Sequence, residues 1–174
     1  LYLRLTDKYD DDEVVAVIDI GTNMTIFSML YRGESIYSRV QNFGGEQYTG
    51  NISEHYAMKR DDAEAIKLSQ NLPLDYDIDV LAPFITSCIQ HIRRNLQMFT
   101  NAGAFQKVSR ISLSGGSALI HELADQVESE LGIATHVANP FSHFSFADEY
   151  LEQAHLVANG PCYMVALGLA MRAL

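Results

Sequence analysis

The segment from Val14 to Thr25 constrains the fold of this chain more than any other stretch of its sequence. An almost unbroken apolar run delivers one acidic residue, Asp19, to a turn that contains Gly21 and a cluster of hydroxyl and amide side chains. A carboxylate can hold a divalent cation or its waters, and a glycine lets backbone N–H groups approach phosphate oxygens closely. The motif therefore predicts a strand that ends at a metal-bound phosphate. The alternative is a plain hairpin turn with an incidental Asp19.

Size, composition and charge narrow the class of protein. The chain has 174 residues, enough for one domain that buries roughly 70% of its unfolded surface. Its hydrophobic fraction of 48% and charged fraction of 20% are ordinary for a globular protein. The net charge of -10, with no basic stripe in the sequence, argues against nucleic acid as a partner. The longest apolar run, Cys162–Met171, is too short to span a bilayer.

The cysteines and the start of the chain give further expectations. Cys88 and Cys162 lie far apart and outside any Cys/His cluster, and the six histidines show no metal-ligand spacing. We expect two buried, reduced thiols in a cytoplasmic protein. The chain begins with Leu1 rather than methionine, which suggests a fragment, a processed chain or a trimmed one. Residues 1–13, acidic toward their end, are interpreted as a linker or the tail of an upstream element.

The hydrophobic pattern predicts strands and helices in a definite order. Strands over residues 14–20, 25–31 and 35–41, joined by short turns, predict an antiparallel meander. The predicted elements that follow are helices at 46–57, 61–70 and 78–99, a strand at 108–113, a helix at 118–131, a strand at 133–137, an irregular segment at 141–160 with core-packing phenylalanines, and a helix from 163 to the end. The helix at 78–99 is the best defined, because its apolar residues recur at three- and four-residue intervals.

Three glycine-containing turns stand at strand ends or ahead of helices. They are Asp19–Gly21, Phe43–Gly45 and Ser114–Ser117. Ligands of open α/β sheets gather at the carboxyl ends of the strands. The third turn is expected to lead into a helix N-terminus, which favours anions, and to leave a surface free of side chains for a purine. Taken singly, each Gly-Gly pair is also explained as a tight strand-to-helix connection.

The order of these segments resembles the second half of actin-like ATPases. The resemblance covers residues 14–174, and Asp-Ile-Gly and Ser-Gly-Gly are shared by the wider superfamily. The Asn-Pro-Phe segment and the terminal Gly-Leu-Ala-Met-Arg are more specific, and they are similar to the carboxyl-terminal half of the PilM family of type IV pilus assembly proteins, relatives of the cell-division protein FtsA. The matching stretches are Val17–Thr25, Phe43–Thr49, Ala63–Lys67, Ser112–Ala118, Val137–Phe141 and Gly168–Arg172.

The resemblance implies an actin-like, ribonuclease H-like α/β fold. In that fold a mixed sheet has an antiparallel three-strand meander followed by parallel strands, with helices on its faces. Residues 14–45 and 77–174 would form the larger subdomain, 2A, and residues 46–76 a small inserted helical subdomain, 2B. Residues 1–13 would then be a linker to, or the tail of, an N-terminal half that this sequence does not contain.

ATP and Mg²⁺ are the ligands that the resemblance implies. Asp19 matches the acidic residue that meets the magnesium ion through water. Gly21, Thr22 and Asn23 match the turn that faces the β- and γ-phosphates. No residue is identified as a catalytic base.

At the other end of the nucleotide, the resemblance implies contacts with the adenosine. Gly115, Gly116 and Ser117 match the adenosine motif. Glu64 and Lys67 match positions that reach the ribose and the base from the smaller subdomain. From the residues alone, Glu64 and Lys67 are otherwise a charged pair three apart on a solvated helix.

The function implied is that of a nucleotide-dependent structural switch in a cytoplasmic scaffold of the type IV pilus inner-membrane platform, which serves twitching motility. Its partner would be a PilN-like membrane protein that docks mainly on the missing half. This chain alone is expected to bind ATP weakly or not at all, because the first half carries its own phosphate loop. Apolar surface uncovered near residues 14–30 and on the final helix suggests a homodimer.

Three other functions stay open. The first is the carboxyl half of a sugar kinase or polyphosphate-processing phosphatase of the same superfamily. The second is an FtsA-like, polymer-forming division protein, which should carry a membrane-binding amphipathic helix at its end, although none is visible at Met171–Leu174. The third is an interaction domain with an inactive nucleotide site.

Overall fold

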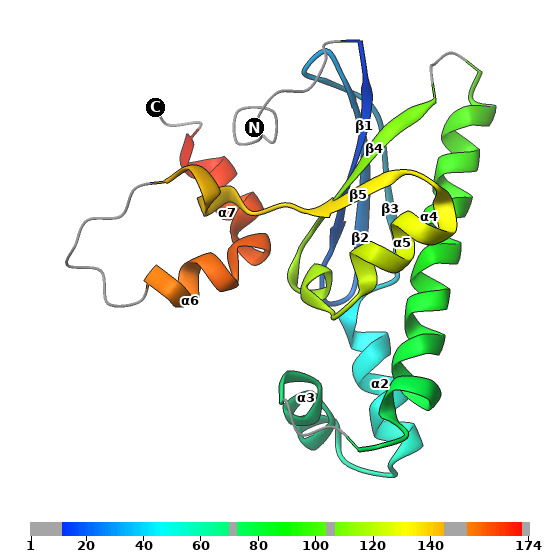
Figure 1. Ribbon diagram of the computed structural model, residues 1–174, viewed down its shortest axis with the longest axis vertical. Helices are drawn as coiled ribbons and strands as arrows, with labels where there is room; N and C mark the ends of the chain where they lie inside the picture. Colours follow the sequence, from blue (N-terminus) through cyan, green and yellow to red (C-terminus); the bar gives the residue numbers. More distant parts are fainter. Residues whose placement is uncertain (1–11, 70–72, 104–106, 145–152, 172–174) are drawn as a thin grey trace.

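The computed structural model describes residues 12–69, 73–103, 107–144 and 153–171. A central sheet carries a long helix on one face and shorter helical segments on the other (Figure 1). Further helices extend beyond one end of the sheet. None of the helices in these described ranges combines the length and the apolarity that a bilayer crossing requires.

Five strands form the sheet in the order β3-β2-β1-β4-β5. The first three make an antiparallel meander, whereas β4 runs parallel to β1 and β5 runs parallel to β4. The predicted mixed sheet is therefore confirmed. The strands are β1 (Val14–Ile20), β2 (Thr25–Tyr31), β3 (Glu34–Gln41), β4 (Val108–Ser114) and β5 (Ala134–Val137).

The central strand β1 is apolar on both faces because both faces are covered. Val14, Ala16, Ile18 and Ile20 are fully buried in the main core, which includes the inner face of the long helix α4 (Ala82–Asn101). Residues of the opposite face pack in a second, smaller cluster. That cluster joins Val15 and its neighbours to Ala138 and to Met164 of helix α7.

The remaining helical segments differ in length and type. A five-residue π-helical turn, η1, precedes α4, and short 3₁₀ turns separate the later elements. The α2–α3 pair and η1 occupy the end of the molecule beyond the sheet (Figure 1). The helical segments other than α4 are α2 (Gly45–His55), α3 (Arg60–Leu68), η1 (Asp77–Leu81), η2 (Gly116–Leu119), α5 (Leu123–Leu131), η3 (Pro140–His143), α6 (Gln153–Ala158), η4 (Gly160–Tyr163) and α7 (Met164–Ala170).

One helix prediction is wrong. The sequence predicted a continuous helix over 118–131 that begins directly after the Ser-Gly-Gly turn. Instead a single 3₁₀ turn, η2, follows the glycines, and α5 begins only at Leu123. Glu122 interrupts the predicted helix because its backbone is left-handed, with φ of 61°. The helix N-terminus expected at Ala118, after the glycines, is therefore only one short 3₁₀ turn.

The two ends of the chain need smaller corrections. The segment predicted as irregular contains η3 and α6, and the last helix is preceded by η4. Part of that segment, with Phe146, lies outside the described residues, as do residues 1–11 of the expected linker and residues 172–174 of the last helix. In the described part of that linker, Glu13 forms an ion pair with Arg110 at 3.3 Å, so its charge is not simply solvated.

Aromatic side chains anchor the α2–α3 end of the molecule to α4. Tyr48 of α2 stacks on Phe84 of α4, with ring centroids 4.6 Å apart. The hydroxyl of Tyr76 donates a hydrogen bond of 2.6 Å to the hydroxyl of Tyr48, and both side chains are buried. Burial and the neighbouring Tyr76 raise the pKa of Tyr48, so both groups stay neutral.

This pair generates a test of stability. Tyr76→Phe removes the donor and leaves the buried Tyr48 hydroxyl without it, so we expect the free energy of unfolding to fall by about 1–3 kcal/mol. The double variant Tyr48→Phe/Tyr76→Phe leaves no orphaned hydroxyl and should recover most of that loss. Urea denaturation of Tyr76→Phe, Tyr48→Phe and the double variant measures these losses, and a double variant whose loss equals the sum of the two single losses would contradict the pairing.

Candidate nucleotide cleft

A cleft of about 1070 Å³ lies where the carboxyl ends of β1 and β4 meet the start of α2. All three glycine-containing turns contribute to its lining, and α3 closes its other side. The residues that were predicted as ligands and that line this cleft are Asp19, Gly21, Thr22, Glu64, Lys67, Gly115, Gly116 and Ser117. Asn23 belongs to the same turn as Thr22 and is exposed, but it is outside this lining.

Backbone hydrogen bonds tie the first turn to the start of α2. The N–H of Gly21 donates to the carbonyl of Met24 at 3.0 Å, which closes the turn on itself. The N–H of Gly45 then donates to the carbonyl of Gly21 at 2.9 Å, and that of Glu46 to the carbonyl of Thr22 at 2.8 Å. These first amides of α2 are therefore used to hold the turn and are not free for a phosphate.

Two glycines are required by the closeness of these backbones. A Cβ on Gly44 would lie 2.4 Å from the carbonyl oxygen of Gly21, and a Cβ on Gly115 would lie 2.5 Å from that of Ile20. Gly115 also has φ of 84°, which is unfavourable for any other residue. Their absent side chains thus let the second and third turns approach the first. Ser117 sits just beyond, so close that its Oγ would be 2.8 Å from a Cβ on Gly45.

Asp19 is held at the centre of this arrangement. It is the register partner of Ser114 in the parallel pair of β1 and β4, and the Ser114 hydroxyl donates to its Oδ2 at 2.9 Å. Cys162, which was expected to be buried, is exposed and lines the same cleft, whereas Cys88 is buried. Partial burial and the charge of Asp19 raise the pKa of the Cys162 thiol, with a backbone hydrogen bond opposing them.

Glu64 and Lys67 face the cleft in a local network with α2. The ammonium of Lys67 lies 2.7 Å from Oε2 of Glu64 and donates to the hydroxyl of Thr49 at 2.9 Å. The Thr49 hydroxyl lies 2.6 Å from Oε2 of Glu64 and 3.1 Å from the carbonyl of Gly45. The Lys67 side chain is only 17% exposed, so the alternative of a solvated charged pair does not describe it.

This network sets the ionisation of Glu64. Partial burial raises the pKa of its carboxyl, but hydrogen bonds from Lys67 and Thr49 and the charge of Lys67 outweigh that effect, so the pKa lies below its usual value. Glu64 is therefore ionised at neutral pH. A carboxylate of this kind can accept hydrogen bonds from the hydroxyls of a sugar.

The cleft as a whole is acidic. Among the described residues that line it, four are acidic and two are lysine or arginine: Asp19, Glu46, Asp61, Glu64, Arg60 and Lys67. Both cations are already engaged, Lys67 with Glu64 and Arg60 with Glu46. An anionic ligand would therefore need a cation of its own. Carboxylate oxygens such as those of Asp19 are the ligands that Mg²⁺ prefers, directly or through water.

Sequence reasoning missed several members of the cleft. Thr49, Arg60 and Cys162 line it without having been predicted there, and Ser114 orients Asp19. Thr49 lies four residues after Gly45, one turn along α2, which places it on the face of the glycine turn. No local pattern marks Arg60 or Cys162, because each reaches the cleft only through the way its segment packs.

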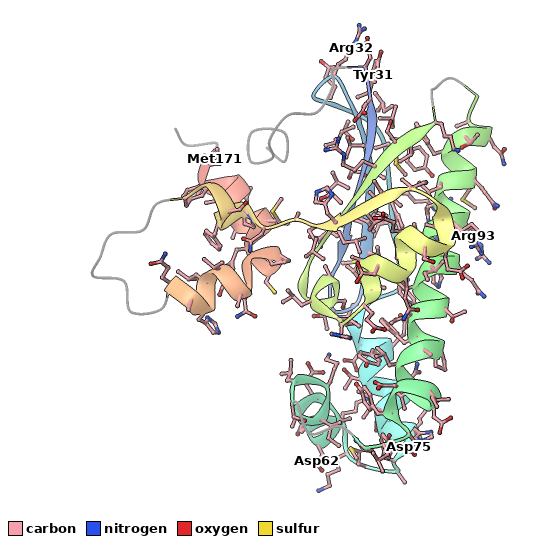
Figure 2. The ribbon with its side chains drawn as sticks, viewed as in Figure 1. Tyr31, Arg32, Asp62, Asp75, Arg93 and Met171 are labelled. Carbon is pink, nitrogen blue, oxygen red and sulfur yellow. The ribbon has the colours of Figure 1, made fainter. Side chains whose placement is uncertain are left out.

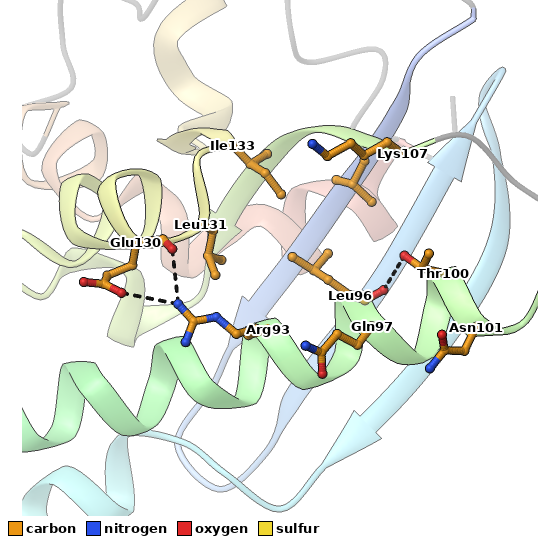
Figure 3. Close-up of a pocket in the computed structure, with 10 residues that line it drawn as sticks. Arg93, Leu96, Gln97, Thr100, Asn101, Lys107, Glu130, Leu131 and Ile133 are labelled. Carbon is orange, nitrogen blue, oxygen red and sulfur yellow. Dashed lines mark hydrogen bonds and ion pairs between the residues drawn. The ribbon is translucent and has the colours of Figure 1, made fainter.

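A second hollow, of about 510 Å³, lies at the opposite end of the sheet between α4 and the link from α5 to β5 (Figure 3). Its floor is apolar, with Leu96, Leu131 and Ile133. The guanidinium of Arg93 spans one end and donates to the carbonyl of Glu130 at 3.1 Å and to its carboxylate at 3.3 Å. This hollow shares no lining residue with the cleft, and none of the predicted ligands lines it.

Solved structures place this fold in the actin-like class. A structure titled PilM-PilN type IV pilus biogenesis complex matches with a TM-score of 0.84 and 26% identity, over 98% of this chain and 48% of that one. A complex of the archaeal actin homologue Ta0583 with ADP matches with a TM-score of 0.61 and 17% identity, over 96% of this chain and 53% of that one. The predicted actin-like fold is therefore confirmed.

The chain belongs to the PilM family, because the family described as type IV pilus assembly protein PilM matches residues 1–174. Among curated proteins, the cell division protein FtsA of Buchnera aphidicola subsp. Acyrthosiphon pisum (strain APS) is 27% identical over 187 residues, which cover 89% of this chain and 42% of FtsA. The chain thus spans somewhat less than half the length of the PilM and FtsA chains that it matches.

The crowding at Gly115 is open to a stability test with a matched control. Gly132 also has a positive φ, 63°, but a Cβ there would meet nothing within 4 Å. We expect Gly132→Ala to lower the free energy of unfolding by about 1 kcal/mol from backbone strain alone. Gly115 has φ of 84° and ψ of 168°, a backbone region that is essentially restricted to glycine, and a Cβ there would also clash with β1, so the loss in Gly115→Ala should be larger by at least about 2 kcal/mol. Equal losses in chemical denaturation would contradict the steric role of Gly115.

Proposed function

We propose that this chain is the nucleotide-binding second half of a PilM-type scaffold, and that its cleft takes the magnesium complex of ATP. Asp19 would hold the metal through water. Gly21, Thr22 and Asn23 would face the β- and γ-phosphates. The proposal ranks above an FtsA-like division protein or a sugar kinase because the PilM family model spans the whole chain.

The observation that carries the proposal is the convergence of the first and third turns on one cleft. Asp19 and Ser114 are joined by a hydrogen bond, and Gly115, Gly116 and Ser117 follow directly on the same rim. The rim therefore offers a carboxylate and, directly beside it, a surface free of side chains. We infer that the base and ribose lie over that surface, on the side of the cleft that Glu64 and Lys67 of α3 line.

The helices beyond the sheet support a switching role. We propose that residues 46–76 form a subdomain, 2B, which moves against a larger subdomain, 2A, made of residues 14–45 and 77–174. A nucleotide bound between Asp19 and Lys67 would contact both parts and favour their closed arrangement, since a ligand stabilises the state that it binds better. No side chain is assigned as a hydrolytic base, so the proposal is a switch and not a fast ATPase.

The family supports a proposal for the partner and the place of action. The matched solved structure is named as a PilM-PilN complex, and we propose a PilN-like membrane protein as the partner of the longer protein. That contact would lie mainly outside residues 1–174. The protein would then act on the cytoplasmic side of the inner membrane, in the assembly platform of type IV pili and in the twitching motility that they produce.

The exposed thiol in the cleft provides the test of nucleotide binding. Cys88 is buried and its pKa is raised to about 12 by that burial, so a maleimide should label only Cys162. Magnesium ATP should slow this labelling, by about tenfold at ten times its Kd, because bound nucleotide covers the thiol. Because the cleft supplies contacts from one side, we expect a Kd well above the micromolar range for this 174-residue chain.

Controls separate binding from indirect effects. Cys162→Ser should abolish the signal, and Asp19→Asn should weaken the protection by magnesium ATP. Unchanged labelling at nucleotide concentrations of several millimolar would overturn the binding of magnesium ATP by this chain alone. Calorimetry that finds micromolar affinity would contradict the expectation of a one-sided site.

Exposed apolar side chains also support self-association, and we propose a homodimer. Ile26 and Val40 are cross-strand partners on β2 and β3, with Met24 next to them, and they are 39%, 54% and 51% exposed. Val165 and Leu169 of α7 are exposed as well. Contiguous exposed apolar side chains of this kind mark interaction surfaces more often than chance.

Sedimentation tests the dimer. The chain should sediment as a dimer at high concentration, and Val40→Lys should shift it toward monomer because it places a charge in the apolar contact. Leu74→Lys is the matched control, since Leu74 is fully exposed and lies outside this group. A monomer at all concentrations, or an equal effect of both variants, would count against this surface.

A further inference from the structure

A group of metal-ligating side chains lies at the end of the molecule beyond the sheet, apart from the cleft. His55 ends α2, whereas Asp75 precedes η1 and Asp79 lies within it. Their donor atoms all lie within 4.8 Å of one another. Figure 2 labels Asp75 at this end of the ribbon. No sequence pattern marks this group, because His55 and Asp75 are 20 residues apart.

The distance between the donors of His55 and Asp75 matches that between two ligands of a tetrahedral metal ion. Nε2 of His55 and Oδ2 of Asp75 are 3.4 Å apart, which is longer than a good hydrogen bond. Two ligands that each lie about 2.1 Å from a tetrahedral zinc ion are about 3.4 Å from each other. The third donor, on the exposed side chain of Asp79, lies within 4.8 Å of the other two.

Neighbouring contacts hold the ligands in place. The N–H of Asp79 donates to the carbonyl of Asp75 at 2.9 Å, so the two aspartates are one helical turn apart and share a face. The hydroxyl of Tyr56 donates to Oδ1 of Asp75 at 2.9 Å, while Oδ2 is the oxygen that faces His55. Ligating carboxylates are commonly oriented by such a second hydrogen bond.

We propose that His55, Asp75 and Asp79 bind one Zn²⁺ ion. An imidazole and two carboxylates are ligands that zinc takes, and a fourth position is left for water or for a group from a partner. The ion would join the end of α2 to the turn that starts α4. It would thereby close the intervening chain into a loop, and that loop carries Glu64 and Lys67 of the cleft. Zinc would therefore restrict the movement of α3.

Calorimetric titration of the 174-residue chain with zinc chloride tests the proposal, in a buffer with millimolar Mg²⁺ to occupy oxygen-only sites. We expect one ion per chain. His55→Ala and Asp79→Asn should each lower the zinc affinity by more than about tenfold, and Tyr56→Phe by about tenfold. Asp77→Asn is the matched control, because it removes an exposed charge between the two ligands but is outside the group.

A second readout guards against variants that fold poorly. Cobalt(II) in place of zinc should give the strong visible absorption of a tetrahedral ion with the wild-type chain, and His55→Ala should lose it while keeping its circular dichroism. Three results would overturn the site. They are no binding of zinc, an equal loss in Asp77→Asn and Asp79→Asn, or only the weak absorption of octahedral cobalt.

Discussion

Close backbone contact among three turns fixes the cleft on which the rest of the site depends. The carbonyl oxygens of Ile20 and Gly21 lie where the side chains of Gly115 and Gly44 would otherwise be. Because those side chains are absent, the turns after β1, β3 and β4 meet within hydrogen-bonding distance. The positions of Asp19, Ser117 and Thr49 all follow from this contact, since each is fixed on a segment that begins or ends at one of the turns.

The same contact changes how a phosphate would be bound. Helix N-termini usually offer free amides to anions, but Gly45 and Glu46 at the start of α2 already donate to the first turn. The turn after β4 leads into a single 3₁₀ turn and offers little helix dipole. Binding of a phosphate would therefore depend on the turn at Gly21 and on a metal near Asp19, because Lys67 is already paired with Glu64.

Much of the fold could be predicted from the sequence because its signals are local. The apolar run of β1, the turn at Gly21 and the periodicity of α4 each stand in one short segment, and all three are found as predicted. The strand order required the resemblance to actin-like proteins. The prediction of a helix from residue 118 was wrong because Glu122 adopts a left-handed backbone. Glutamate has a high intrinsic helix propensity, and no nearby residue signals this conformation.

The lining of the cleft was predictable where its residues sit on motifs and not where packing assembles them. Asp19, Gly115 and Gly116 were predicted from their turns and do line the cleft, whereas their role as ligands stays a prediction. Thr49 bonds to both Glu64 and Lys67, so these two residues form a partly buried network and not a solvated pair. Thr49 reaches them only because α2 packs on α3. Cys162 reaches the cleft because the N–H of Gly115 donates to the carbonyl of Pro161 at 3.0 Å, a contact across distant segments.

The excess of carboxylates in the cleft disfavours ligands that carry a large negative charge. Uncomplexed triphosphate would meet four carboxylates with only two neutralised by side-chain cations, and such repulsion weakens as ionic strength rises. A triphosphate that arrives with its divalent cation carries less charge and brings a positive centre for Asp19. The occupancy of the cleft would then depend on the concentration of free divalent ion as well as on that of nucleotide, which would couple any motion of α3 to the ionic conditions around the protein.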